Sequence, residues 1–132
     1  MNAFIVEAKN KPGMLAEVSK AIADKGVNIL SGSVIGLGES GGFAFISNDE
    51  TSTRSALREA NLKFREIEVM PISVSDEPGS LAKIAKKLAD AGVNVDLILP
   101  TGMSGNKMTL ALGVDKIDAA RKAIGAEVAT PA

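Results

Sequence analysis

Two short loops contain the residues best suited to binding a small charged molecule. The first reads Asn-Lys-Pro-Gly-Met-Leu over 10–15, and the second reads Asp-Glu-Pro-Gly-Ser-Leu over 76–81. Pro-Gly after an apolar strand predicts the start of a helix. The first backbone N–H groups of a helix point outward with the positive end of its dipole, which suits a carboxylate. A plain helix start that binds nothing has the same letters, so both interpretations remain open.

One asparagine follows the first predicted helix of each half of the chain. The chain reads Gly-Val-Asn-Ile over 26–29 and Gly-Val-Asn-Val over 92–95, with Asn28 and Asn94 early in predicted strands. Asparagine is depleted in strands. Its amide both donates and accepts, which suits the ammonium and carboxylate groups of a free amino acid. A turn or capping role is the alternative interpretation.

Composition excludes several kinds of chemistry. The 132 residues include no His, Cys, Trp or Tyr, so we expect no thiol nucleophile, no Cys/His zinc site, no histidine acid–base pair and no cofactor. Fifteen basic residues balance sixteen acidic ones, which argues against a nucleic-acid partner. The apolar run before Glu7 has only four residues, so we expect no signal peptide, no membrane span and a cytoplasmic location.

An internal repeat indicates the architecture. Residues 12–29 and 78–95 are identical at ten of eighteen aligned positions, at an offset of 66 that is half the chain length. Each half reads as strand, helix, two strands, helix and strand. We therefore predict an α+β fold of two ferredoxin-like βαββαβ units packed side by side, with domains at 1–69 and 70–132. The last strand of the second unit, around 127–130, is the weakest of the predicted elements.

Finer expectations follow from spacing and from the repeat. We expect the first helix of each unit to bury one apolar face, made of Leu15, Val18 and Ile22 or of Leu81, Ile84 and Leu88. Asp49 and Asp115 stand 66 residues apart, and each is predicted to cap the second helix of its unit.

One motif is a decoy. Residues 36–41 fit G-x-G-x-x-G, the dinucleotide-binding pattern, but that pattern requires a following helix. Here a strand-like run, Gly-Phe-Ala-Phe-Ile-Ser, follows, so we predict a wide hairpin turn. Residues 101–106 occupy the same place in the second unit, which also favours a turn.

The repeated pattern, a polar residue two before Pro-Gly followed later by Gly-Val-Asn, resembles the ACT domain, an amino-acid-sensing module of many enzymes of amino-acid metabolism. The resemblance covers essentially the whole chain, which looks like a stand-alone tandem ACT protein. It implies an effector bound where two domains pair, held by the loop after the first strand and the start of the second strand. Matched position by position, it implies these ligand-binding residues: Asn10, Gly13, Met14, Leu15, Asn28, Ile29, Asp76, Gly79, Ser80, Leu81, Asn94 and Val95.

The resulting hypothesis is a regulatory protein that is not an enzyme. It binds a free amino acid at the ACT interfaces and relays its level to an enzyme or regulator, and an edge strand or sheet face could pair two chains into a homodimer. One alternative is an interaction or dimerisation module that binds no ligand. Another is an enzyme on a ferredoxin-like scaffold, since fold does not determine function. The loop at 10–13 has no Arg for acylphosphatase-type chemistry.

Overall fold

The computed structural model describes residues 1–127 and divides into two compact units. The first unit comprises Asn2–Ile67, and the second comprises Met1 and the chain from Glu68 onward. The elements of the first unit are β1 (Asn2–Lys9), α1 (Met14–Ala23), β2 (Ile29–Leu37), β3 (Ser40–Ser47), α2 (Glu50–Glu59) and the beginning of β4 (Lys63–Ser75). Those of the second are the rest of β4, α3 (Ser80–Asp90), β5 (Val95–Ser104), β6 (Lys107–Val114), α4 (Ile117–Ala123) and the 3-10 turn η1 (Gly125–Glu127).

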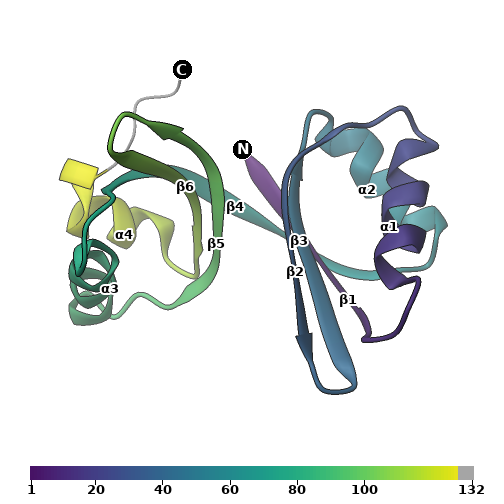
Figure 1. Cartoon of the computed structure of the whole chain (residues 1–132), viewed down its shortest axis with the longest axis horizontal. Coiled ribbons are helices and arrows are strands. Elements are labelled where there is room, and N and C mark those ends of the chain that lie inside the picture. The colour runs from purple at the N-terminus through teal and green to yellow at the C-terminus, as the bar shows by residue number, and fades with distance from the viewer. Residues whose placement is uncertain (128–132) are drawn as a thin grey trace. The chain divides into compact units, whose positions relative to one another are not determined.

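Each unit is a sheet with its helices on one face. The strand order is β2-β3-β1-β4 in the first unit and β4-β6-β5 in the second. Figure 1 shows α1 and α2 on one face of the first sheet, and α3 and α4 on one face of the second. The predicted α+β fold of two ferredoxin-like units is confirmed. Of the closing strand expected around 127–130, Glu127 ends η1, and the other residues lie outside the described part of the chain.

The core of each unit lies between its sheet and its helices. Phenylalanines dominate the first core, where the Phe4 and Phe43 rings lie 5.7 and 4.9 Å from the ring of Phe45. Val18 and Ile22 of α1 pack against these rings with under 2% of their surface exposed. The second core is aliphatic and is built on Met70, Ile72, Ile84, Leu88, Leu110 and Leu112. Apolar residues on one face of each strand and helix therefore define both cores.

Two of the predicted core leucines are not buried. Leu15 is 47% exposed and Leu81 is 50% exposed. In both helices the inward position of the first turn belongs to the preceding residue, because Met14 is buried at 6% exposure and Ser80 is half-buried. The prediction for these leucines was wrong, and both lie on the surface beside the Pro-Gly loops.

The glycine-rich stretch at 36–41 forms a hairpin, as predicted, but the turn is tight rather than wide. β2 extends to Leu37 and β3 begins at Ser40, which leaves two residues in the turn. Gly38 has φ +64°, a left-handed conformation that glycine adopts without steric cost. The second hairpin also turns in two residues, so most of 101–106 belongs to β5.

One extra residue in β5 breaks the exact repeat. Both units have an irregularity near the start of their second strand, but the β5–β6 pairing shifts again between Pro100 and Gly102. Thr101 is the added residue of this bulge, and its hydroxyl donates to the carbonyl of Thr109 at 3.1 Å. Equivalent positions therefore differ by 66 before the bulge and by 67 after it.

The shift corrects one predicted helix cap. Asp49 caps α2 as expected, and its Oδ1 accepts from the backbone N–H of Ser52 at 3.0 Å. Asp115 does not cap α4, whose N-cap is Lys116 with no side-chain bond. The prediction for Asp115 was wrong because, at an offset of 67, its counterpart is Asn48 and not Asp49.

Candidate functional site

Both Pro-Gly loops end in a glycine that starts the helix. Gly13 and Gly79 are the N-caps of α1 and α3, with φ of +92° and +86°, and neither helix has a side-chain cap. A Cβ built on either glycine would meet nothing within 4 Å. The positive φ therefore favours glycine at these positions, and no neighbouring group crowds the Cα of either glycine.

Asn10 is committed to its own unit. Its backbone N–H donates to the Glu39 carbonyl at 2.9 Å, and its side-chain Nδ2 donates to the Gly38 carbonyl at 2.9 Å. A Cβ on Gly36 would lie 2.6 Å from that nitrogen. Asn10 thus clamps the β2–β3 turn with one of the two N–H groups of its side-chain amide. This structural role was missed by sequence reasoning, although Gly36 was a signal of close packing.

Asp76, the counterpart of Asn10, makes the equivalent backbone hydrogen bond but no equivalent side-chain hydrogen bond within residues 1–127. Its N–H donates to the Asn106 carbonyl at 2.7 Å. Within residues 1–127 its carboxylate makes no hydrogen bond or ion pair, since an ionised carboxylate cannot donate to a turn carbonyl as an amide does. The two loops therefore share one backbone hydrogen bond, but at this position Asn10 has a side-chain partner and Asp76 has none among residues 1–127.

Asn28 and Asn94 are fixed through their main chains. The N–H of Asn28 donates to Oδ1 of Asn48 at 2.9 Å, and the Asn28 carbonyl accepts from the Asn48 N–H at 3.1 Å. Asn94 and Asp115 repeat this pair at 2.9 and 3.2 Å. Both Asn28 and Asn94 are exposed, and Nδ2 of Asn94 donates to Oδ1 of Asp96 at 3.1 Å. The structure therefore holds their backbones rigidly and leaves both side chains at the surface.

The other predicted site residues divide between core and surface. Met14 belongs to the first core, and Ile29 packs partly against it. Val95 is 37% exposed. The buried side chain of Met14 therefore cannot contact a ligand directly, whereas the exposed side chains of Leu15 and Leu81 can.

The structure does not bring the loop and the asparagine of the first unit together. The 10–15 loop lies beside the β2–β3 turn, because Asn10 bonds to Gly38 and Glu39. Asn28 lies at the other end of β2, next to Asn48. The strand between them has nine residues, a separation of roughly 26 Å at about 3.3 Å per residue. One amino acid cannot touch both ends of a single unit.

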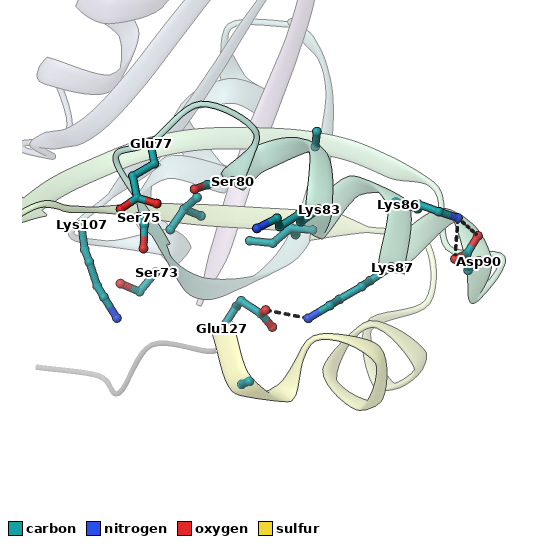
Figure 2. A pocket seen from close by; sticks show the side chains of 14 residues that line it. Ser73, Ser75, Glu77, Ser80, Lys83, Lys86, Lys87, Asp90, Lys107 and Glu127 are labelled. Carbon is teal, nitrogen blue, oxygen red and sulfur yellow. Dashed lines mark hydrogen bonds and ion pairs between the residues drawn. The ribbon is translucent and has the colours of Figure 1, made fainter.

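The larger of two described cavities, about 660 Å³, lies in the second unit beside the 76–81 loop. Figure 2 shows Glu77 and Ser80 of the loop region at this cavity, with Ser73 and Ser75 of β4, the α3 lysines and Glu127 of η1 around it. Lys87 donates to Oε1 of Glu127 at 2.8 Å, while Oε2 of Glu127 is buried with no hydrogen-bond partner. Of the twelve predicted site residues, only Ser80 lines this cavity. Its hydroxyls and mixed charges favour a polar ligand.

A second cavity, about 590 Å³, lies in the first unit and is lined by none of the predicted residues. Ile35, Leu37 and the Glu7–Lys63 ion pair of 2.9 Å are at its edge. The hydrogen bond from Lys63 lowers the pKa of Glu7.

In the described chain no cluster of three His, Cys, Asp or Glu residues could hold a metal ion. No helix among residues 1–127 is both long and apolar enough to cross a membrane.

Comparison with known families identifies the first unit. Residues 3–61 match the family model of the ACT domain. This match lies within the first unit, Asn2–Ile67, and identifies that unit as an ACT domain. The resemblance inferred from the repeated loop is confirmed.

Solved structures of the same fold cover nearly the whole chain. Protein BT0572 from Bacteroides thetaiotaomicron is 21% identical with a TM-score of 0.75, over 95% of this chain and 86% of that one. The regulatory subunit of aspartate kinase from Thermus thermophilus, in a ligand-free form, is 18% identical with a TM-score of 0.63, over 96% and 91%. At these identities the likeness establishes the fold of both units. No curated protein sequence matches the chain.

Proposed function

We propose that the protein is a non-catalytic regulator that binds a free amino acid at its ACT domains and relays its level to a partner enzyme or regulator. The observation that carries this proposal is the pair of helix starts at Gly13 and Gly79, neither of which has a side-chain cap. Gly13 lies within the residues that match the ACT domain, and the resemblance of the two loops extends the argument to Gly79. Two such starts offer backbone N–H groups to a carboxylate. The regulatory-subunit description of a structural neighbour is consistent with this role.

The second loop is the better candidate for the ammonium end of the ligand. The Asp76 carboxylate is negatively charged and makes no hydrogen bond or ion pair within residues 1–127, whereas Asn10 is neutral and its amide is bonded to the Gly38 carbonyl. The cavity beside Glu77 and Ser80 adds hydroxyl groups and charges of both signs close to the same loop. We therefore propose unequal sites, with the stronger one in the second unit.

The ligand level would be relayed by thermodynamic linkage, in which ligand binding and domain pairing stabilise each other. A ligand that bridges two domains stabilises the paired arrangement by no more than its difference in affinity between paired and unpaired states. Because the loop and Asn28 of one unit are too far apart for one ligand, a complete site draws on two ACT domains. The domain boundaries at 1–69 and 70–132, a homodimer and a cytoplasmic location remain parts of this proposal.

A thermal-shift screen of the twenty amino acids tests it. We expect at least one to raise Tm, because a ligand that binds only the folded state stabilises by RT ln(1 + [L]/Kd), about 2.7 kcal/mol at a hundredfold excess over Kd. Asp76→Asn should reduce that shift, while the matched variant Asp118→Asn on α4 should leave it unchanged. If no amino acid shifts Tm, the alternative of an interaction module without a ligand is favoured.

A further inference from the structure

We propose that the cavity of the second unit is a ligand site of its own, which takes a free acidic amino acid, L-aspartate or L-glutamate. Every described residue that lines it belongs to the second unit, so no other domain contributes to it. Its volume of about 660 Å³ is typical of small-molecule sites. The site goes beyond the proposed function, which places an amino acid where two ACT domains pair.

The cavity has more free positive charge than free negative charge. Two of its four lysines form ion pairs with carboxylates of the lining, at 3.0 and 2.8 Å: Lys86 with Asp90, and Lys87 with Glu127. The side chains of Lys83 and Lys107 make no hydrogen bond or ion pair within residues 1–127. Glu77 is the one lining carboxylate without an ion pair in this part of the chain. Two free cations against one free anion favour a ligand of net negative charge.

Three serine hydroxyls add hydrogen-bonding capacity between these charges. Figure 2 shows Ser73 and Ser75 of β4 and Ser80 at the start of α3 around the cavity. All three residues are half-buried, and their hydroxyls make no hydrogen bond within residues 1–127. A hydroxyl can donate to a carboxylate oxygen. With Lys83 and Lys107, the serines therefore provide donors for two carboxylate groups.

Glu127 provides the acceptor that an ammonium group requires. Its Oε1 accepts from Lys87, while its Oε2 is buried and has no partner in the described chain (Figure 2). A buried carboxylate oxygen without a donor is unfavourable, so it favours a ligand that brings an N–H group. A ligand with two carboxylates and one ammonium group matches the free groups of the cavity, and an acidic amino acid has this composition.

The polar lining is peculiar to the second unit. At the offset of 66, Lys83 corresponds to Glu17 of α1, and Ser80 corresponds to the buried Met14. The first unit thus has a carboxylate in place of a free cation and a core side chain in place of a hydroxyl. Because the two units share one fold, the fold does not account for this difference, and only the second unit is suited to an acidic ligand.

Isothermal titration calorimetry of the full chain with L-glutamate and L-aspartate tests the ligand class. We expect both to bind, and L-glutamine and glutarate to bind at least about tenfold more weakly than L-glutamate. Glutamine lacks the second carboxylate that the free lysines favour, and glutarate lacks the ammonium group that Glu127 favours. A chain that binds neither acidic amino acid, or that binds L-glutamine or glutarate as tightly as L-glutamate, would overturn the proposal.

Two lysine variants of equal charge change locate the site. Lys83→Glu gives α3 the residue that α1 has at this position, and Lys122→Glu changes an exposed residue of α4 outside the cavity lining. We expect L-glutamate to bind at least about tenfold more weakly to Lys83→Glu and with wild-type affinity to Lys122→Glu. Circular dichroism of both should match the wild type. Lys107→Gln provides a second test should Lys83→Glu not fold, and wild-type affinity in the folded cavity variants would show that L-glutamate binds elsewhere.

Asp76→Asn separates this site from the helix-start site of the proposed function. Asp76 does not line the cavity, so the variant should bind L-glutamate with wild-type affinity. An amino acid whose Tm shift depends on Asp76 and not on Lys83 would support the proposed function even if the cavity binds nothing. L-glutamate binding that depends on Lys83 and not on Asp76 would support the cavity site alone.

Discussion

Asn94 and Asp115 hold each other by two hydrogen bonds. The Asn94 N–H donates to Oδ1 of Asp115 at 2.9 Å, and the Asp115 N–H donates to the Asn94 carbonyl at 3.2 Å. Asn28 and Asn48 form the same pair in the first unit. The start of the second strand is thus tied to the end of the third in both units, which fixes the backbone of the proposed ligand-contacting asparagines.

Removing the Asp115 carboxylate should loosen this tie. We expect Asp115→Ala to lower the free energy of unfolding by about 1–2 kcal/mol, because the Asn94 N–H loses its acceptor. Asp115→Asn is the matched control, since Asn48 shows that an amide oxygen accepts the same bond. Urea unfolding measures the difference. Equal stability of Asp115→Ala and wild type would contradict the structural role.

The Asn10 clamp predicts a coupling between two positions. Gly36→Ala should be destabilising, because its Cβ would lie 2.6 Å from Nδ2 of Asn10 and displace the bond to the Gly38 carbonyl. The expected loss is about 0.5–1.5 kcal/mol. In an Asn10→Ala background the same glycine substitution should cost much less. A double-mutant cycle by urea unfolding measures this coupling, and additive effects would count against the clamp.

Thr53 should be the most sensitive polar residue of α2. It is fully buried, its hydroxyl lies 2.7 Å from that of Ser47, and it donates to the Asp49 carbonyl at 2.7 Å. Thr53→Val should cost about 1–3 kcal/mol, because the Ser47 hydroxyl loses its buried partner. Thr51→Val, at an exposed position of the same helix, is the control and should change stability little. Thermal unfolding distinguishes the two.

The first unit should lose stability in mild acid through Glu66. Hydrogen bonds of 2.7 Å from Arg54 to both carboxylate oxygens are the main cause that lowers the pKa of Glu66, and Asn2 adds a further bond. A carboxyl group whose pKa is lower when folded contributes stability above its unfolded pKa, about 4.3, and that contribution disappears as pH falls through the folded value.

Glu66→Gln should therefore flatten the fall in stability between about pH 5 and pH 3. Urea midpoints of the wild type and the variant at several pH values measure this. Glu17→Gln on the exposed side of α1 is the control. The explanation fails if the wild type and Glu66→Gln lose stability in parallel over this range.

The secondary structure of this protein is determined largely by short stretches of sequence. The strand and helix periods, the Pro-Gly helix starts and the Asp49 cap depend on residues within a few positions of one another, and the structure confirms them. The repeat extends these signals to the second unit. The offset of 66 between equivalent residues does not hold beyond Thr101, which is an added residue in β5. The local sequence pattern does not indicate which strand residue will be unpaired in such a bulge.

What the sequence determined by itself was the set of elements and the two loops that could receive a ligand, since both follow from local backbone preferences. Only the tertiary structure decided what those residues touch. It turned Asn10 toward its own hairpin, left Leu15 at the surface and placed Asn28 at the far end of β2 from the loop. Contacts between residues far apart in the chain depend on strand register and packing, which are set by the whole sheet rather than by any one segment.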